Sequence, residues 1–393
     1  MNRLRERLQA VLVPLFAIVA AFAVGAIFII LTDFDHLRAL GTDPGGAIGG
    51  AIDLVFRGYG AMLAGAIGDP GRIVLAIQSG SERDLASAIR PLTEALLFAT
   101  PLIFASLAVG VSFHAGLFNF GADGQFLIGG LGATIGAVVL GGMVPPYATL
   151  LGALFAGTLF GAAYGFLPGL LKARTGAHEV ITTLMLNTIA VQIVIYVVRS
   201  GSFSGNLAAF PMVPRLIDLP TIRLDWGFVV ALLVAVALSL VLFRTTVGFE
   251  LRATGLSRTA ARFAGMRPNR VTVVAMSLSG GIAGMGGAFL TLGAAGGLSG
   301  SGAGFVALAL ALIGGLRPSG IVLVALLYGA LNNGAKRMVI ATGIPLDLLV
   351  VVIALVLAFV AAPGLIGSVL RLKDRSPAPA IPSFGPSGSG EGL

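Results

Sequence analysis

Long blocks of apolar residues without a charged side chain limit the folds that this chain can adopt. Residues 10–31 (AVLVPLFAIVAAFAVGAIFIIL) contain no Asp, Glu, Lys or Arg, and similar blocks recur along the sequence. At about 1.5 Å per residue, some 20 helical residues cross the hydrocarbon core of a bilayer. The alternation of apolar and polar positions that a membrane β-barrel needs is absent. We therefore predict an all-α fold, a polytopic integral membrane protein.

Ten segments are expected to form transmembrane or re-entrant helices. They lie at residues 10–31, 91–112, 119–142, 147–170, 179–199, 226–243, 271–293, 304–316, 318–335 and 346–363. The eighth and ninth are short and are broken by GGLRPSG (314–320). They form either a re-entrant pair or one kinked span. Residues 300–315 loosely parallel 117–136, so an architecture of two related halves is a further alternative.

Small residues recur at four-residue spacing in two of these spans. Gly157, Gly161 and Gly165 lie in the fourth span, and Gly280 and Gly284 lie in the seventh. This spacing lets helix backbones approach each other closely in a membrane. We therefore predict packing seams at these glycines and assign them no role in solute binding.

The basic residues indicate the orientation of the chain. Cytoplasmic loops of membrane proteins carry an excess of Lys and Arg. The N-terminal end, the connection 244–270 with its six arginines, and the basic stretch 371–375 fall on one predicted side. We therefore expect both termini in the cytoplasm, although Lys336 and Arg337 fall on the opposite side. The net charge of +8 is spread over short loops, so it does not indicate a nucleic-acid partner.

Two segments differ from the predicted transmembrane domain, which covers 1–375. Segment 32–90 holds seven acidic residues and is predicted to be extracytoplasmic and too polar to span. Its part 47–67 is apolar enough to lie along the outer membrane interface, and a solvated loop is the alternative. The end of the chain, 376–393, is rich in Pro, Gly and Ser and is predicted to be a disordered tail.

The connection 244–270 is the longest charged segment on the predicted inner side. Within it, TAARFAGM (259–266) predicts a short helix that ends at Gly265. The expected apolar side of this helix comprises Ala260, Ala261, Phe263 and Ala264. Because such a helix cannot bury itself in the membrane, we expect it to dock into a groove on another protein. The alternative is a basic loop that holds anionic lipid headgroups.

The sequence argues against catalysis by this chain. It lacks the G-x-x-x-x-G-K-[ST] phosphate-binding loop, and none of its lysines, Lys172, Lys336 and Lys373, follows a glycine directly. It has no cysteine and three histidines, which disfavours a metal site or a covalent enzyme mechanism. If the protein is a pump, its ATPase is a separate chain, and we expect no cofactor here.

Polar residues interrupt the apolar sequence LFNFGADGQFLIGGLGATIG (117–136). They are Asn119, Asp123 and Gln125. A carboxylate at the centre of a membrane helix costs about 2.5–3.5 kcal/mol on insertion scales. Either these residues line a watery pathway, with the rings of Phe118, Phe120 and Phe126 available to stack on a base, or they form an irregular helix start. In that second alternative Asp123 accepts from backbone N–H groups or holds a neighbouring Arg. Both alternatives exclude an aspartate that faces lipid.

A second polar set opens the fifth span. Glu179 stands at its predicted start, where the helix dipole favours an acidic side chain. Asn187 lies eight residues further on, on roughly the same helical face. Together with Thr182 and Thr183, these residues either meet the solute pathway or bond to a neighbouring helix.

Four stretches together carry a resemblance to a known family. They are GTDPGGAIGGAI (41–52), FHAGLFNFGADGQFLIGGLGA (113–133), HEVITTLMLNTIA (178–190), and LRATGLSRTAARFAGM with SLSGGIAGMGGAF (251–289). In this order they resemble bacterial ABC importer permeases of the branched-chain amino acid and simple sugar permease superfamily. Within it the purine-nucleoside branch is the most similar.

The resemblance implies a permease subunit in the bacterial plasma (inner) membrane that works with several partners. These are a cytoplasmic ABC ATPase that binds ATP and Mg²⁺, a second permease subunit, and an extracytoplasmic substrate-binding protein. A heterodimer of two different permeases is expected rather than a homodimer. The implied solute-pathway residues are Phe118, Asn119, Phe120, Asp123, Gln125, Glu179 and Asn187. The implied coupling segment to the ATPase includes Arg252, Ala253, Gly255, Ala260, Ala261, Phe263 and Gly265.

The expected cargo is a nucleoside. Ribose, another simple sugar or a branched-chain amino acid are alternatives within the same family. An ion-coupled secondary transporter is a further alternative, but it would need several ionisable groups deep in the spans. The sequence has few such groups and has an arginine-rich connection instead.

Overall fold

The computed structural model describes residues 2–39, 41–200, 212–217, 219, 221–293 and 303–361. The predicted tail 376–393 and the basic stretch 371–375 lie outside these residues. The described chain is helical, with two isolated β-bridges in place of a sheet. The helices are α1 (Asn2–Thr32), α2 (Phe34–Ala39), α3 (Pro44–Ala66), α4 (Pro70–Ser79), α5 (Glu82–His114), α6 (Ala122–Leu140), α7 (Pro146–Thr175), α8 (Glu179–Arg199), α9 (Gly227–Arg244), α10 (Thr246–Leu256), α11 (Arg258–Phe263), α12 (Pro268–Leu292), α13 (Ala303–Ile313), α14 (Pro318–Thr342) and α15 (Leu346–Ala361).

The predicted all-α membrane fold is confirmed. In the described ranges, eight helices are long and apolar enough to cross a membrane, namely α3, α5, α6, α7, α8, α9, α12 and α14. Each of the ten predicted segments coincides with a helix. The eighth and ninth are two separate helices, because α13 ends at Ile313 and a turn with positive φ at Gly315 and Leu316 precedes α14. One kinked span is therefore wrong for this part of the chain.

Segment 32–90 is neither a solvated loop nor too polar throughout to span. It forms α2, α3, α4 and the start of α5, and α3 has the length and composition of a membrane span. Several of its polar residues stand at helix starts, where their side chains accept from unpaired backbone N–H groups. Asp43 accepts from Gly46 N at 3.0 Å, and Asp69 accepts from Gly71 N at 3.0 Å. These two acids therefore act as helix caps, a role that was not predicted.

The two residues that disagreed with the predicted orientation, Lys336 and Arg337, contact α5 and the end of α3. Arg337 Nη1 donates to Ala64 O at 3.3 Å. Asn333 Nδ2 donates to Gly65 O and to Pro91 O, each at 2.9 Å. The neighbouring Lys336 lies over the Phe98 ring, with Nζ 4.8 Å from the centroid. A cation near a helix C-terminus is favoured by the dipole, so these basic side chains have a local structural reason to be there.

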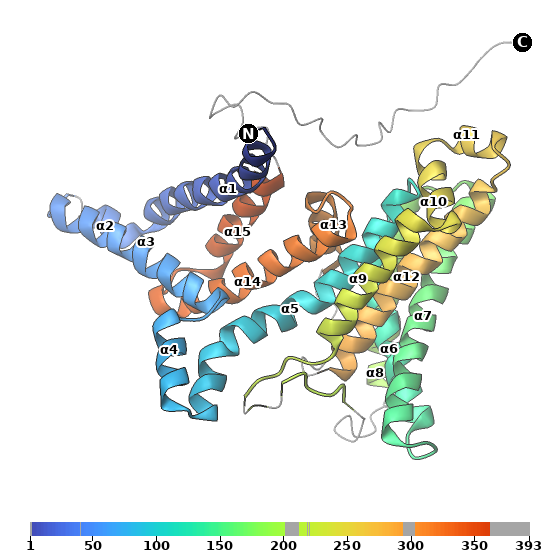
Figure 1. The fold of residues 1–393 in the computed structure, drawn as a ribbon, viewed down its shortest axis with the longest axis horizontal. Helices are drawn as coiled ribbons and strands as arrows, with labels where there is room; N and C mark the ends of the chain where they lie inside the picture. Colours follow the sequence, from blue (N-terminus) through green and yellow to red (C-terminus); the bar gives the residue numbers. More distant parts are fainter. Residues whose placement is uncertain are drawn as a thin grey trace, which may run out of the picture.

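Helices α6, α7 and α12 lie side by side and contact each other through glycines (Figure 1). A Cβ at Gly161 would fall against Gly280 O and 2.6 Å from Gly284 Cα. A Cβ at Gly165 would lie 3.0 Å from Gly280 Cα. Because nothing larger than hydrogen fits, the predicted packing seams are confirmed.

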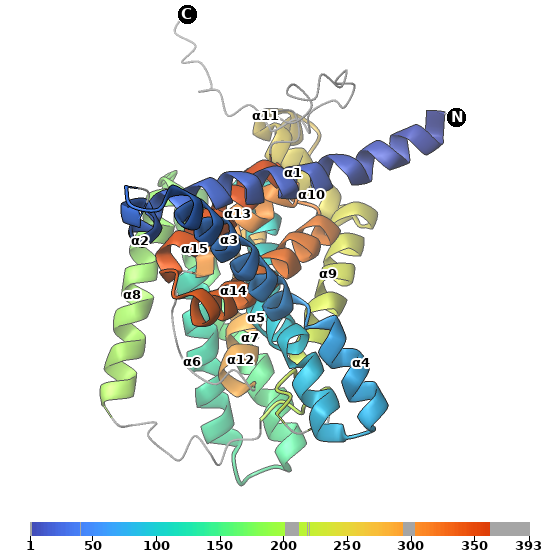
Figure 2. The ribbon, with the colours of Figure 1, turned by 90° about the vertical axis from the view of Figure 1, so that its left-hand side faces the viewer.

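Helix α1 runs across the end of the molecule that also carries α10 and α11 (Figure 2). It packs against α15, and Tyr59 of α3 donates to Phe22 O at 2.7 Å. The beginning of α1 and the α10–α11 pair therefore share one end of the molecule, in Figure 1 as in Figure 2.

Candidate solute pathway and coupling segment

Asn119, Gln125 and Ser279 form a buried amide cluster. Asn119 and Gln125 are 0% and 1% exposed. Asn119 Nδ2 donates to Gln125 Oε1 and to Ser279 Oγ, each at 2.8 Å. Ser279 Oγ in turn donates to Ala108 O at 2.6 Å. The cluster thus joins α5, the loop 115–121, α6 and α12, so its polar atoms determine the loop conformation in this state of the protein.

Asp123 lies half-buried in the first turn of α6 and holds the start of α13. Its Oδ1 accepts from Gly304 N at 2.6 Å. The carboxylate therefore stands near the N-terminal turns of two helices, where both dipoles favour a negative charge. Its hydrogen-bond partner is a backbone N–H rather than an arginine. The insertion cost of a carboxylate is offset in this way, as the helix-start alternative predicted.

Asn187 bridges α8 to the junction between the loop 115–121 and α6. Its Nδ2 donates to Phe120 O at 2.7 Å, and its Oδ1 accepts from Gly124 N at 2.9 Å. Both backbone groups lie outside regular helix bonding. Of the two alternatives given for this residue, bonding to a neighbouring helix is the one observed.

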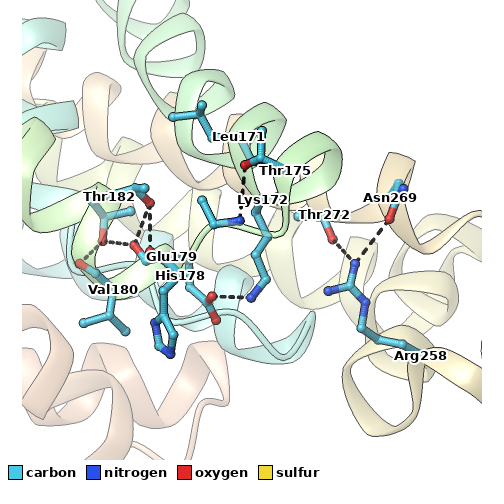
Figure 3. A network of polar contacts seen from close by, with 12 residues as sticks. Leu171, Lys172, Thr175, His178, Glu179, Val180, Thr182, Arg258, Asn269 and Thr272 are labelled. Atoms are coloured by element: carbon cyan, nitrogen blue, oxygen red, sulfur yellow. Dashed lines mark hydrogen bonds and ion pairs between the residues drawn. The ribbon is translucent and has the colours of Figure 1, made fainter.

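Glu179 begins α8, as predicted, and forms an ion pair that closes the turn from α7 (Figure 3). Its Oε2 lies 2.5 Å from Lys172 Nζ, and the Glu179 side chain is buried. Gly176 adopts a φ of 72° at the end of α7. Lys172 was not predicted as the partner of Glu179. The signal that could have found it is the separation of seven residues across a glycine-containing turn.

An aromatic row leads from α5 to α13. Phe118 meets Phe113 edge to face at 5.0 Å between ring centroids, and it stacks on Phe120 at 6.5 Å. Phe120 contacts Phe305 at 6.1 Å. Phe305 is 56% exposed and directly follows Gly304, the partner of Asp123. The row therefore ends at an accessible ring beside a carboxylate. Phe113 and Phe305 were not predicted as part of this group.

The predicted coupling segment forms α10 and α11, and Gly265 ends it with a φ of 82°, as expected. Of the expected apolar side, Ala260, Phe263 and Ala264 are exposed and Ala261 is not. Ala261 is buried, whereas Ala260 is exposed and Phe263 is 89% exposed. Helix α11 has six residues, less than two turns, and within it Ala261 packs inward while Phe263 points outward.

The three most exposed large apolar side chains of α10 and α11 are Phe249, Leu256 and Phe263, and we call them the coupling surface. In the same segment, the Arg252 guanidinium lies over the Phe243 ring at 5.2 Å, and Ala253 is half-buried. Arg258 Nη2 donates to Asn269 Oδ1 at 3.4 Å and to Thr272 Oγ1 at 3.3 Å (Figure 3). These contacts hold α11 against the start of α12.

Comparison with known proteins identifies the fold. A family model described as "Branched-chain amino acid transport system / permease component" matches residues 92–361. The chain belongs to this permease family. It is 33% identical to the guanosine ABC transporter permease protein NupP of Bacillus subtilis, over 94% of this chain and 99% of that protein.

Two further relatives are also ABC transporter permeases. It is 30% identical to the nucleoside ABC transporter permease protein NupB of Lactococcus lactis, over 92% of this chain and 94% of that protein. It is 32% identical to the glucose ABC transporter permease protein TsgB13 of Haloferax volcanii, over 68% and 75%. The predicted resemblance is confirmed. The permease is a multi-pass membrane protein and a transport component of an ABC transporter.

Proposed function

We propose that this permease is the membrane subunit of an ATP-driven importer of nucleosides. The observation that carries the proposal is its similarity over nearly the full length to a guanosine permease and a nucleoside permease. The permease forms the solute pathway together with a second, different permease subunit. An extracytoplasmic binding protein delivers the nucleoside, and a separate ATPase binds ATP and Mg²⁺.

The coupling surface is the proposed docking site for that ATPase. Phe263 is 89% exposed and Leu256 is 75% exposed, with Arg258 and Arg262 beside them. Burying one such side chain stabilises a complex by about 1.5–3 kcal/mol. A groove on the ATPase that accepts two rings and a leucine, with acidic groups at its rim, would match this surface.

The exposed end of the aromatic row is the proposed contact for the nucleoside. Phe305 offers a ring face to a base, and stacking of this kind contributes about 1–3 kcal/mol per base. Asp123 lies next to it and accepts hydrogen bonds, which suits ribose hydroxyls. Asn119, Gln125, Glu179 and Asn187 have protein partners in the structure, so we assign them to holding the pathway rather than lining it.

In the membrane, the proposed orientation puts both termini and the coupling surface in the cytoplasm of a bacterial cell. The position of α10, α11 and the beginning of α1 at one end of the molecule supports it. Because the chain has no cysteine, Phe263→Cys creates a single thiol. An impermeant thiol reagent should label it from the cytoplasmic side alone, and labelling from outside would contradict the orientation.

The function is tested in lipid vesicles that contain the permease with its ATPase, second permease and binding protein. Tritiated guanosine should enter only when ATP is hydrolysed, and other nucleosides should compete with it. Uptake driven by an ion gradient without ATP would contradict the proposal.

A sugar importer is the second candidate, because the glucose permease of Haloferax volcanii is 32% identical to this chain. The same vesicles discriminate between the two. Competition by glucose or ribose, with no competition by adenosine, would favour the sugar. The aromatic row favours a nucleoside, since a base has a flat face to stack on the exposed ring of Phe305.

A further inference from the structure

Helix α10 of the coupling segment touches the turn that follows α5 with no side chain in between. A Cβ at Gly255 would lie 2.8 Å from Gly116 N and 3.0 Å from Ala115 C, and closer still to His114 O. In the opposite direction, a Cβ at Gly116 would lie 3.0 Å from Gly255 Cα and from Gly255 O. The two backbones are therefore in direct contact.

The turn itself has a fixed shape. Gly116 has a φ of 69°, a conformation that favours glycine. Gly116 N donates to Phe113 O and Leu117 N donates to Ser112 O, each at 3.0 Å. Leu117 is 2% exposed. A displacement of this turn therefore moves the residues that follow it rather than being absorbed by loose side chains.

The residues that follow lead directly to the proposed pathway. Phe118 belongs to the aromatic row, and Asn119 belongs to the buried amide cluster. Asp123 comes four residues after Asn119 and holds the start of α13. A short, tightly bonded stretch of backbone thus connects the Gly255 contact to Asp123.

A second contact joins the same two regions beside the first. Phe243, at the end of α9, meets the His114 ring edge to face at 5.9 Å. The guanidinium of Arg252 on α10 lies 5.2 Å from the centroid of the same Phe243 ring. Phe243 therefore stands between α10 and the last residue of α5.

We propose that Gly255 is a positioning residue: its backbone contact with Gly116 transmits movement of the coupling segment to the loop 115–121 and from there to Asp123. The inference rests on the proposed function, because it assumes an ATPase that moves α10 and α11. Phe243 supports the same connection through its contacts with His114 and Arg252. The role requires glycine at 255, since any side chain there would separate the two backbones.

The test is the number of guanosine molecules taken up per ATP hydrolysed by the assembled transporter in vesicles. In Gly255→Ala this ratio should fall at least tenfold, while ATP hydrolysis stays within about twofold of wild type and the ATPase still copurifies. The matched control is Gly60→Ala on α3, where a Cβ would meet nothing within 4 Å. The control should leave the ratio unchanged.

A second variant decides the matter if Gly255→Ala does not assemble. Phe243→Leu keeps an apolar side chain but removes the ring between His114 and Arg252, and it should lower the ratio about two- to threefold. If Gly255→Ala assembles, a wild-type ratio of guanosine taken up per ATP hydrolysed would overturn the inference. If it does not assemble, a wild-type ratio in Phe243→Leu would overturn it. Wild-type vesicles that hydrolyse ATP without taking up guanosine would instead overturn the proposed function.

Discussion

Helices α12 and α8 are both apolar enough to span a membrane, yet they are packed very differently. Of the 18 residues that form the apolar stretch of each helix, 67% are buried inside the molecule in α12 and only 17% in α8. The difference lies in small residues rather than in hydropathy. Helix α12 contacts α7 through Gly280 and Gly284, whereas α8 presents Ile181, Met185 and Tyr196 outward. In lipid an exposed apolar side chain carries no penalty, so small residues indicate the interior better than apolar ones do.

The largest effect is expected at the glycine seam between α7 and α12. Gly161→Leu would push a branched side chain into Gly280 O and Gly284 Cα. Overpacking typically costs 1–3 kcal/mol, and with backbone on the opposite side we expect about 3 kcal/mol or more. The measurement is the thermal unfolding midpoint of the purified permease in detergent. The matched variant on α8, Ile181→Leu, should leave the midpoint unchanged. Equal effects at both sites would break the comparison.

A smaller loss is expected where α8 does contact the interior. Asn187→Leu keeps the side-chain volume but leaves Phe120 O and Gly124 N without their partner. An unsatisfied buried backbone group costs about 1–3 kcal/mol, so we expect a loss of about 2–3 kcal/mol in the free energy of unfolding. The control on the same helix is the exposed Gln192→Leu, with a change near zero. If both variants change the free energy of unfolding equally, Asn187 does not account for the stability that α8 contributes.

Asp123 sharpens the comparison further, because it is half-buried and, among the described residues, its hydrogen-bond partner is Gly304 N. Asp123→Leu loses the bond to Gly304 N, and a hydrogen bond to a charged group contributes about 1.5–3 kcal/mol. We expect uptake to fall at least tenfold while the protein still inserts into the membrane. Asp123→Asn keeps an acceptor and should lose less. Unchanged uptake in Asp123→Leu would remove the residue from both the pathway and the helix junction.

The smallest effect on stability is expected at the coupling surface. Phe263→Ala removes a ring that is 89% exposed. The free energy of unfolding should therefore change by less than about 0.5 kcal/mol. Copurification of the ATPase should nevertheless fall by about tenfold. Thr259→Ala, an exposed change on the same helix, is the control. A stability loss without a loss of ATPase binding would show that Phe263 is part of the fold instead.

The helices of this permease could be predicted from sequence because their signal is local. Apolar length gave the spans, Gly265 gave the end of α11, and spacing gave the seam at Gly161. The error at 32–90 was also local: acidic residues were counted without asking which of them, such as Asp43 and Asp69, precede a helix.

The site contacts could not be predicted because they join residues far apart in sequence. Asn119 and Ser279 are separated by 160 residues, and Asp123 and Gly304 by 181. A buried amide needs some partner, so the sequence could indicate that one exists but could not identify it. The pair of Glu179 and Lys172 is the exception, because only seven residues separate the two side chains and the sequence could have indicated it.

The bonds that Asn333 and Arg337 make to the end of α3 have a consequence for how the molecule can be divided. The family model begins at residue 92, yet these two side chains from deep within the matched region bond to Ala64 O and Gly65 O. Trimming the protein to the matched region would remove the two α3 carbonyls to which the Asn333 amide and the Arg337 guanidinium donate. Helix α3 is therefore not a dispensable addition, and the smallest autonomous version of this permease should include it.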